Sequence, residues 1–338
     1  MTEGMRRRKG CPTSPATNAN LGLMALPAGQ RVFVLIPTHT TRHLAACLAS
    51  LAHQTRPPDG VVVTCDNDLP EIASLLRSIW PRVQARAGAA IPMWNARRPH
   101  QGLAQLNQVR NNGIRTLMSH GGASGRDLIV IIDGDTMLAA DAIARHAAQR
   151  DAGTDLIIPY RILLSQADTE ALDPERVLAD GVPEVELITA EARSRLEQRH
   201  RRYRRHVLLW RLGLGKKQKP KIIGGHHAFT VDVASRINGF DEEYTGYGFD
   251  DDDFSRRGNS LRPRIRIAIA VREIMAYHLW HPVRAPQRQE DASGYARFSR
   301  TDLPLFTAHG LTSPRPQPQV IVEAIASGGQ PTGHRGDS

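Results

Sequence analysis

Short apolar segments alternate with segments of helical periodicity across residues 32–159, and this alternation constrains the fold more than any other feature of the chain. The predicted strands are 32–36, 61–65, 127–132 and 155–159, and the predicted helices are 43–53, 69–79, 101–118 and 139–150. Strands that alternate with helices of this length form βαβ units, in which the strands are parallel and the crossovers right-handed. The sequence therefore predicts an α/β fold, with a mostly parallel Rossmann-like sheet covered by helices on both faces.

The composition is that of a globular protein, with 41% hydrophobic and 23% charged residues among 338. Lysine and arginine (44) exceed aspartate and glutamate (34) by 10, which favours anionic partners. Most of this excess lies within residues 193–221, so it belongs to one segment rather than to the whole fold. Aromatic residues make up only 5% of the chain, and no stacking platform for bases is visible, so we expect no nucleic acid partner.

The cysteines and the N-terminus indicate a cytoplasmic protein. Cys11, Cys47 and Cys65 are far apart and form no Cys-x-x-Cys pair, which favours a reducing compartment. No segment approaches the roughly 20 apolar residues of a membrane span. The basic N-terminus is followed by no apolar core of the kind that a secretory signal has.

Two acidic residues, Asp133 and Asp135, directly follow the predicted strand 127–132 and are separated by Gly134. Open α/β sheets bind their ligands at the carboxyl ends of the strands. Carboxylate oxygens suit Mg²⁺ or Mn²⁺, which often bridge a protein to substrate phosphates. An ordinary turn is the alternative interpretation, because aspartate and glycine are common turn residues.

Four consecutive aspartates occupy positions 250–253, just after Gly246-Tyr247-Gly248. A helix that begins near Phe249 would lessen their mutual repulsion, because the N-terminal end of a helix favours negative charge. A carboxylate held among like charges and shielded from water has a raised pKa, which suits a general base. A solvated acidic helix cap is the alternative. Further along the chain, His278 and His281 offer nitrogen ligands that suit Mn²⁺ better than Mg²⁺, although a core histidine is the commoner case.

Several motifs in a fixed order carry a family resemblance over residues 31–282. They are 34–38 with 48–55, Arg110-Asn111-Asn112-Gly113, Asp133-Gly134-Asp135, 239–242 with 246–252, and Met275-x-x-His278. Together they resemble the family 2 glycosyltransferases of the GT-A fold, with an acceptor-side C-terminal half similar to the galactosyltransferase and chondroitin-polymerase type. The chain departs from this pattern at Cys65, where the family usually has aspartate, at Phe249 (usually glycine) and at Asp250 (usually glutamate).

The resemblance implies a role for each matching residue. The nucleotide would contact Thr38, Asp66, Arg110 and Asp133. The metal would be bound by Asp135 and His278, with Asp133 as a further ligand and His281 as the rival of His278. Asp250 or Asp251 would be the general base, and the motif register favours Asp251. Gly224, Gly225 and Tyr247 would shape the pocket for the acceptor and the donor sugar.

The resemblance further implies a metal-dependent inverting hexosyl- or N-acetylhexosaminyltransferase of polysaccharide biosynthesis. Mn²⁺ or Mg²⁺ would neutralise the leaving diphosphate of a nucleotide-sugar, a UDP-sugar in the first place, and the acceptor would be a glycan or lipid-linked hydroxyl. Two alternatives stay open, a sugar nucleotidyltransferase and a non-catalytic anion- or membrane-binding protein that keeps the fold. The first should carry a glycine-rich basic loop after its first strand, whereas residues 37–40 read Pro-Thr-His-Thr.

We expect five regions along the chain. They are a disordered N-terminus (1–29), a nucleotide-sugar-binding half (30–160), a basic linker or helical insertion (161–221), an acceptor and catalytic half (222–285) and a largely disordered C-terminal extension (286–338). Within the third region, residues 189–212 predict a very basic helix that contains Leu208, Leu209 and Trp210. Such a helix is expected either to lie on the anionic inner face of the cell membrane or to be a solvated charged helix.

Overall fold

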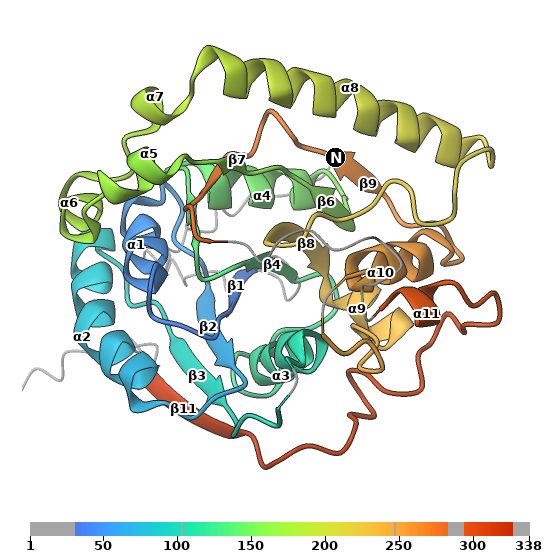
Figure 1. The fold of residues 1–338 in the computed structure, drawn as a ribbon, viewed down its shortest axis with the longest axis horizontal. Coiled ribbons are helices and arrows are strands. Elements are labelled where there is room, and N and C mark those ends of the chain that lie inside the picture. The colour runs from blue at the N-terminus through green and yellow to red at the C-terminus, as the bar shows by residue number, and fades with distance from the viewer. Residues whose placement is uncertain (1–30, 103, 247, 283–293, 327–338) are drawn as a thin grey trace, which may run out of the picture.

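The computed structural model describes residues 31–102, 104–246, 248–282 and 294–326; Tyr247, Cys11 and the predicted N-terminal region 1–29 lie outside them. Its centre is an eight-stranded sheet with the order β11-β3-β2-β1-β4-β8-β6-β9 (Figure 1). The strands are β1 (Val32–Pro37), β2 (Gly60–Cys65), β3 (Met93–Arg97), β4 (Leu128–Ile132), β6 (Leu156–Ile158), β8 (His226–Thr230), β9 (Ile267–Ile269) and β11 (Ile321–Ala326). A small second sheet has the order β5-β10-β7, formed by Thr136–Leu138, Ala276–His278 and Ile162–Leu163.

The strand directions confirm the predicted fold class, a mostly parallel sheet between helices. Strands β3, β2, β1, β4, β6 and β9 run in one direction, and β8 and β11 run against them. The helices are α1 (Leu44–Ala49), α2 (Pro70–Ala87), α3 (Leu106–Ser119), α4 (Ala142–Asp151), α5 (Gln166–Glu170), α6 (Pro174–Asp180), α7 (Glu184–Leu187), α8 (Ala190–Arg211), α9 (Val231–Ile237), α10 (Asp250–Asn259) and α11 (Tyr295–Phe298), and a 3₁₀ turn (Ser50–His53) continues α1. Among the described residues, no helix is both long and apolar enough to cross a bilayer.

Both faces of the central sheet are buried, and this explains the continuous apolar runs in the sequence. On β1, Val32, Val34 and Ile36 belong to the core that α1 and α2 cover. Phe33 and Leu35 alternate with them and belong to the opposite core, beneath α3 and α9. The core therefore fixes the carboxyl ends of β1 and β4 side by side, where ligands of such sheets bind.

Three strands do not follow the predicted strand–helix alternation. Strand β8 inserts antiparallel between β4 and β6, and its two histidines are fully buried. Burial lowers the pKa of His226 and of His227 to about 3, so both pack as neutral core side chains. Strand β3 contains a buried polar residue, Asn95. Strand β11 pairs antiparallel with β3 at the sheet edge, and it coincides with the short apolar run 320–325 near the end of the chain.

The predicted helices form at their expected positions and differ at their ends, whereas α5, α6, α7, α9 and α11 were not predicted. Helix α2 continues to Ala87 with Pro81 inside it, beyond the predicted end at residue 79. Helix α3 begins at Leu106 rather than at residue 101. Residues 294–326 of the predicted C-terminal extension (286–338) lie against the folded core, where the backbone N–H of Arg315 donates to the buried carboxylate of Glu242 at 2.7 Å.

The contact between α3 and the sheet gives a test of the fold. A Cβ atom on Gly113 would lie 2.7 Å from a methyl carbon of Leu35 and 3.1 Å from that of Thr64. Overpacking typically costs about 1–3 kcal/mol, more than the roughly 1 kcal/mol that alanine gains over glycine in a helix. We predict that Gly113→Ala lowers the thermal unfolding midpoint, measured by circular dichroism, by about 2–8 °C.

The control is Gly258→Ala in α10, where a Cβ atom would meet only Ile265, at 3.8 Å. This change should leave the midpoint unchanged or raise it, because alanine favours the helix and nothing crowds it. Equal midpoints for the two variants would contradict the close packing of α3.

Candidate active site

Sheet pairing brings the Asp133–Asp135 segment to the predicted histidines. The segment follows β4 and leads into β5, and β5 pairs with β10 so that Thr136 lies opposite His278. The Nε2 atom of His278 is 3.5 Å from one carboxylate oxygen of Asp135, and Nε2 of His281 is 3.2 Å from the other. Both histidines that the sequence offered as rivals therefore face the same carboxylate.

The donor set of Asp135, His278 and His281 fits a divalent ion. One ligand atom from each residue lies within 4.8 Å of the others. Burial lowers the pKa of His278 to about 4, so its imidazole is neutral at pH 7 and keeps a lone pair for a metal. Nδ1 of His281 lies 3.3 Å from the carbonyl oxygen of Pro282, and the tautomer that donates there keeps the lone pair of Nε2 for an ion beside Asp135. One carboxylate and two imidazoles suit Mn²⁺ better than Mg²⁺.

Asp133 points to a different partner. Its carboxylate is 3.3 Å from Nη1 of Arg161, and its backbone N–H donates to the carbonyl of Gly225 at 3.2 Å. Burial raises the pKa of Asp133, and the charge of Arg161 opposes this rise. Gly225 has φ +80°, and a side chain there would collide with the Arg161 guanidinium and the Asp133 carboxylate. Arg161 is a site residue that the sequence analysis missed, and its only signal was a cation just beyond a strand.

The buried guanidinium of Arg110 joins α3 to the start of α10. Its Nη1 donates to Asp250 at 2.7 Å and to Asp251 at 3.3 Å, and its guanidinium carbon lies 4.9 Å from the centre of the Phe240 ring. The resemblance grouped Arg110 with Thr38 and Asp66, but within the described residues no hydrogen bond or ion pair joins it to either. Its nearest charges are the predicted base candidates.

The four aspartates of α10 have separate partners, which removes most of the repulsion expected from their sequence. Asp250 and Asp251 contact Arg110, whereas Asp252 pairs with Lys221 at 2.6 Å. Asp253 is buried and pairs with Arg257, and also with Arg256, at 2.7 Å each. Asp250 and Asp251 thus belong to the candidate site. Asp252 ties α10 to the segment of Lys221, and Asp253 forms ion pairs within α10.

Asp251 has the environment of a general base. Burial, and next the charge of Asp250, raise its pKa to about 7, while Arg110 and Lys221 oppose the rise. Gly224 lies against it so closely that a Cβ atom there would be 2.7 Å from a carboxylate oxygen. A carboxylate with this pKa exchanges protons near neutral pH.

The start of α10 also explains one departure from the family pattern. Helix α10 begins after Phe249, as predicted, and Phe249 has φ +69°, a conformation that favours glycine. Its ring packs 5.0 Å from that of Phe298 and 5.5 Å from that of Tyr295. Aromatic contacts thus offset the backbone strain at a position where the related motif has glycine.

Thr38 and Asp66 lie at the ends of the neighbouring strands β1 and β2. The backbone N–H of Thr38 donates to the carbonyl of Thr64 at 2.9 Å. The carboxylate of Asp66 is 3.1 Å from Nδ1 of His100. The hydrogen bonds that the His100 ring donates to the Gly102 carbonyl and to Asp66 raise the pKa of His100. Sequence analysis did not find His100, because only the folded chain brings it to Asp66. Tyr247 lies outside the described residues.

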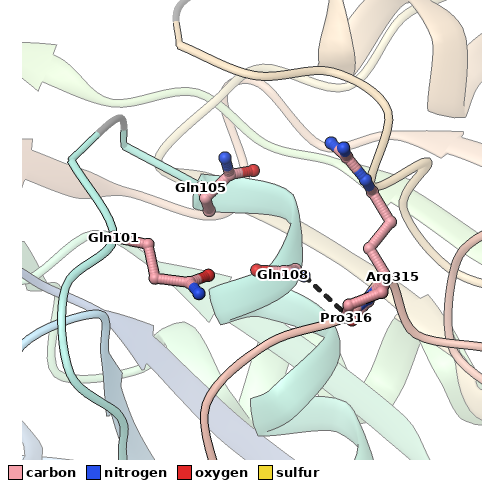
Figure 2. A pocket seen from close by; sticks show the side chains of 5 residues that line it. All are labelled: Gln101, Gln105, Gln108, Arg315 and Pro316. Carbon is pink, nitrogen blue, oxygen red and sulfur yellow. Dashed lines mark hydrogen bonds between the residues drawn. The ribbon is translucent and has the colours of Figure 1, made fainter.

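A cavity of about 240 Å³ beside the N-terminus of α3 is separate from these groups (Figure 2). Its lining consists of Gln101, Gln105, Gln108, Arg315 and Pro316. Gln108 donates to the carbonyl of Arg315 at 3.3 Å and accepts from Arg98 at 3.0 Å. Its amide is thus used to hold the C-terminal segment against α3, and none of the predicted site residues lines the cavity.

Two structures of S. aureus TarS share 13% identity with this chain. One, of residues 1–349, has a TM-score of 0.46 and covers 73% of this chain and 60% of that one; the other has a TM-score of 0.45 and covers 75% and 37%. The chain thus spans at most about three fifths of either structure. No curated protein matches it.

A family model described as the N-terminal domain of galactosyltransferase matches residues 214–279. The matched segment contains Gly224, Gly225, Asp251 and His278, and it ends just before His281. The expected resemblance of the C-terminal half to the galactosyltransferases is thereby confirmed for residues 214–279.

Proposed function

We propose that this protein is a metal-dependent inverting glycosyltransferase that moves a sugar from a nucleotide-sugar, a UDP-sugar in the first place, to a hydroxyl of a glycan or lipid-linked acceptor. The observation that carries the proposal is that the Gly224-Gly225 pair lies against Asp251 on one side and against Asp133 on the other, which links two groups of side chains. One is the Asp135–His278–His281 cluster, and the other is Asp251 with its pKa near 7. The sugar would be a hexose or an N-acetylhexosamine, and the setting would be polysaccharide biosynthesis in the cytoplasm.

The donor side of the proposed reaction rests on charge. Asp135, His278 and His281 would hold Mn²⁺ or Mg²⁺, which when bound would neutralise the leaving diphosphate. Arg161 adds a fixed positive charge beside Asp133, and such preorganised charges stabilise developing negative charge. Thr38, Asp66 and Asp133 would contact the nucleoside at the ends of β1, β2 and β4.

The acceptor side of the proposed reaction rests on Asp251. Its carboxylate would accept the proton of the acceptor hydroxyl as that oxygen attacks the anomeric carbon, and direct displacement inverts the configuration. Asp250 pairs with Arg110, and its charge would keep the pKa of its neighbour Asp251 raised. Gly224 and Gly225 would shape the sugar pocket by letting Asp251, Asp133 and Arg161 lie close to the backbone, and Tyr247 would line the same pocket.

The first prediction concerns the donor. Tested against a panel of UDP-, GDP- and TDP-sugars, the purified chain should slowly release one nucleotide, because water can replace the missing acceptor. The release should occur only with Mn²⁺ present. Asp135→Ala should abolish the release, since it removes the one carboxylate among the three proposed metal ligands. Chromatography of the released nucleotides measures the rate. No release and no Mn²⁺-dependent nucleotide binding by the parent chain would refute the transferase proposal.

The second prediction concerns the metal ligands. Asp135→Ala, His278→Ala and His281→Ala should each weaken Mn²⁺ binding at least about tenfold, because changes even in the groups around metal ligands cost about 10- to 100-fold. Electron paramagnetic resonance of free Mn²⁺ measures the affinity. The matched control is the exposed His120→Ala, which should bind like the parent. A cluster variant that binds as tightly as this control identifies a residue that is no ligand.

The third prediction concerns the base. Asp251→Asn should lower kcat about 10²- to 10⁴-fold while nucleotide binding is kept. In the parent, kcat/KM should rise with pH through about 7 and then level off, because the base works only when deprotonated and its pKa is about 7. Initial rates across this pH range measure the profile.

Asp252→Asn is the matched control for this experiment, because Asp252 lies on the same helix but pairs with Lys221. It should keep the rise through pH 7. The assignment of Asp251 fails if Asp251→Asn keeps the parent rate.

A further inference from the structure

Helix α8 lies along the upper rim of the molecule in Figure 1. Its solvent-exposed side is basic. Its buried residues are Leu196, His200, Tyr203 and Val207, three or four positions apart, so the opposite side of the helix faces outward. Its exposed cations are Arg193, Arg195, Arg199, Arg201, Arg202, Arg204, Arg205 and Arg211, and Lys216 and Lys217 follow in the next loop. The charge excess seen in the sequence is therefore concentrated on one surface.

Most of this charge has no counter-charge among the residues that the structure describes. Arg195 pairs with Glu191 at 2.6 Å, and the guanidinium of Arg199 lies 4.3 Å from the centre of the Tyr160 ring. For the other exposed arginines of α8, no carboxylate of the described residues lies within salt-bridge distance. Cations that repel one another and lack partners favour an anionic surface.

Exposed leucines at the end of α8 indicate which kind of anionic surface fits. The side chains of Leu208, Leu212 and Leu214 are 57%, 62% and 73% exposed. Arg201, Arg205, Leu208 and Leu212 follow helical spacing and form one outward stripe. A bilayer satisfies both kinds of group, because phosphates bind the arginines and the acyl boundary accepts the leucines. A soluble polyanion would use only the charges.

We propose that the outward face of α8, continued to Lys217, docks on an anionic lipid bilayer. The proposal goes beyond the proposed reaction and does not depend on it, because vesicle binding is measured without donor or acceptor.

Hydrogen bonds couple this face to the helix of the candidate base. Nε1 of Trp210 donates to the carbonyl of Asn259 at 3.1 Å, and the Asn259 amide donates to the carbonyls of Lys217 and Pro220. Lys221 pairs with Asp252 on the same helix, α10. A docked α8 would thus hold the Asp250–Asp251 end of α10 at a fixed place relative to the bilayer.

The test is sedimentation of the full chain with vesicles of phosphatidylcholine containing about 30% phosphatidylglycerol, in about 0.1 M salt, beside vesicles of phosphatidylcholine alone. Binding should require the anionic lipid. A triple variant, Arg201→Gln, Arg204→Gln and Arg205→Gln, should bind the anionic vesicles about a hundredfold more weakly. The matched control is Arg77→Gln, Arg82→Gln and Arg86→Gln on α2, which removes the same charge elsewhere and should bind like the parent.

A second variant separates a bilayer from a soluble polyanion. Leu208→Ser, Leu212→Ser and Leu214→Ser should weaken vesicle binding several-fold and leave binding to dextran sulfate unchanged, because only the bilayer contacts the leucines. Equal loss in the α8 and α2 variants, binding without anionic lipid, or vesicle binding indifferent to the leucines would each overturn the proposal. The last outcome would show a face that binds polyanions by charge alone.

Discussion

The candidate active site depends on the ion pairs that the buried guanidinium of Arg110 forms. It contacts two carboxylates at the start of α10 and lies over the ring of Phe240. Removing one partner of a buried ion pair typically costs about 3–5 kcal/mol, because the other charge stays buried without compensation. The close contact of Gly113 with Leu35 seats α3 on the sheet, so core packing decides where this charge lies.

The surroundings of Asp135 and of Asp251 suit two different roles, a metal ligand and a general base. Asp135 faces two imidazoles because β5 pairs with β10, whereas Asp251 faces Asp250 and Arg110 at the start of a helix. The raised pKa of Asp251, about 7, suits that carboxylate to accept a proton, whereas the two imidazoles beside Asp135 suit Asp135 to bind a metal. One short stretch of four aspartates thus yields a base candidate, its charged neighbour and two structural ion pairs.

Sequence reasoning predicted the parts whose pattern is local. Buried parallel strands are continuous apolar runs, and the start of α10 at Phe249 follows from the acidic run. Strand β8 was missed because two neutral histidines stand where apolar residues were expected, and its antiparallel pairing joins segments far apart in sequence. Arg161 and His100 reach the site only through tertiary contacts. The motif resemblance assigned Arg110 to the nucleotide, but a motif does not indicate which side of α3 the guanidinium faces. In the structure it faces Asp250 and Asp251.

The most direct test is a crystal structure of the full chain with Mn²⁺ and UDP, with the ion located by anomalous scattering. We predict an anomalous peak at coordination distance from Asp135, His278 and His281. The diphosphate should lie on the side of the ion away from these side chains, and the uridine at the ends of β1 and β2. Mn²⁺ bound away from Asp135, or UDP bound away from that sheet edge, would contradict the proposed transfer reaction.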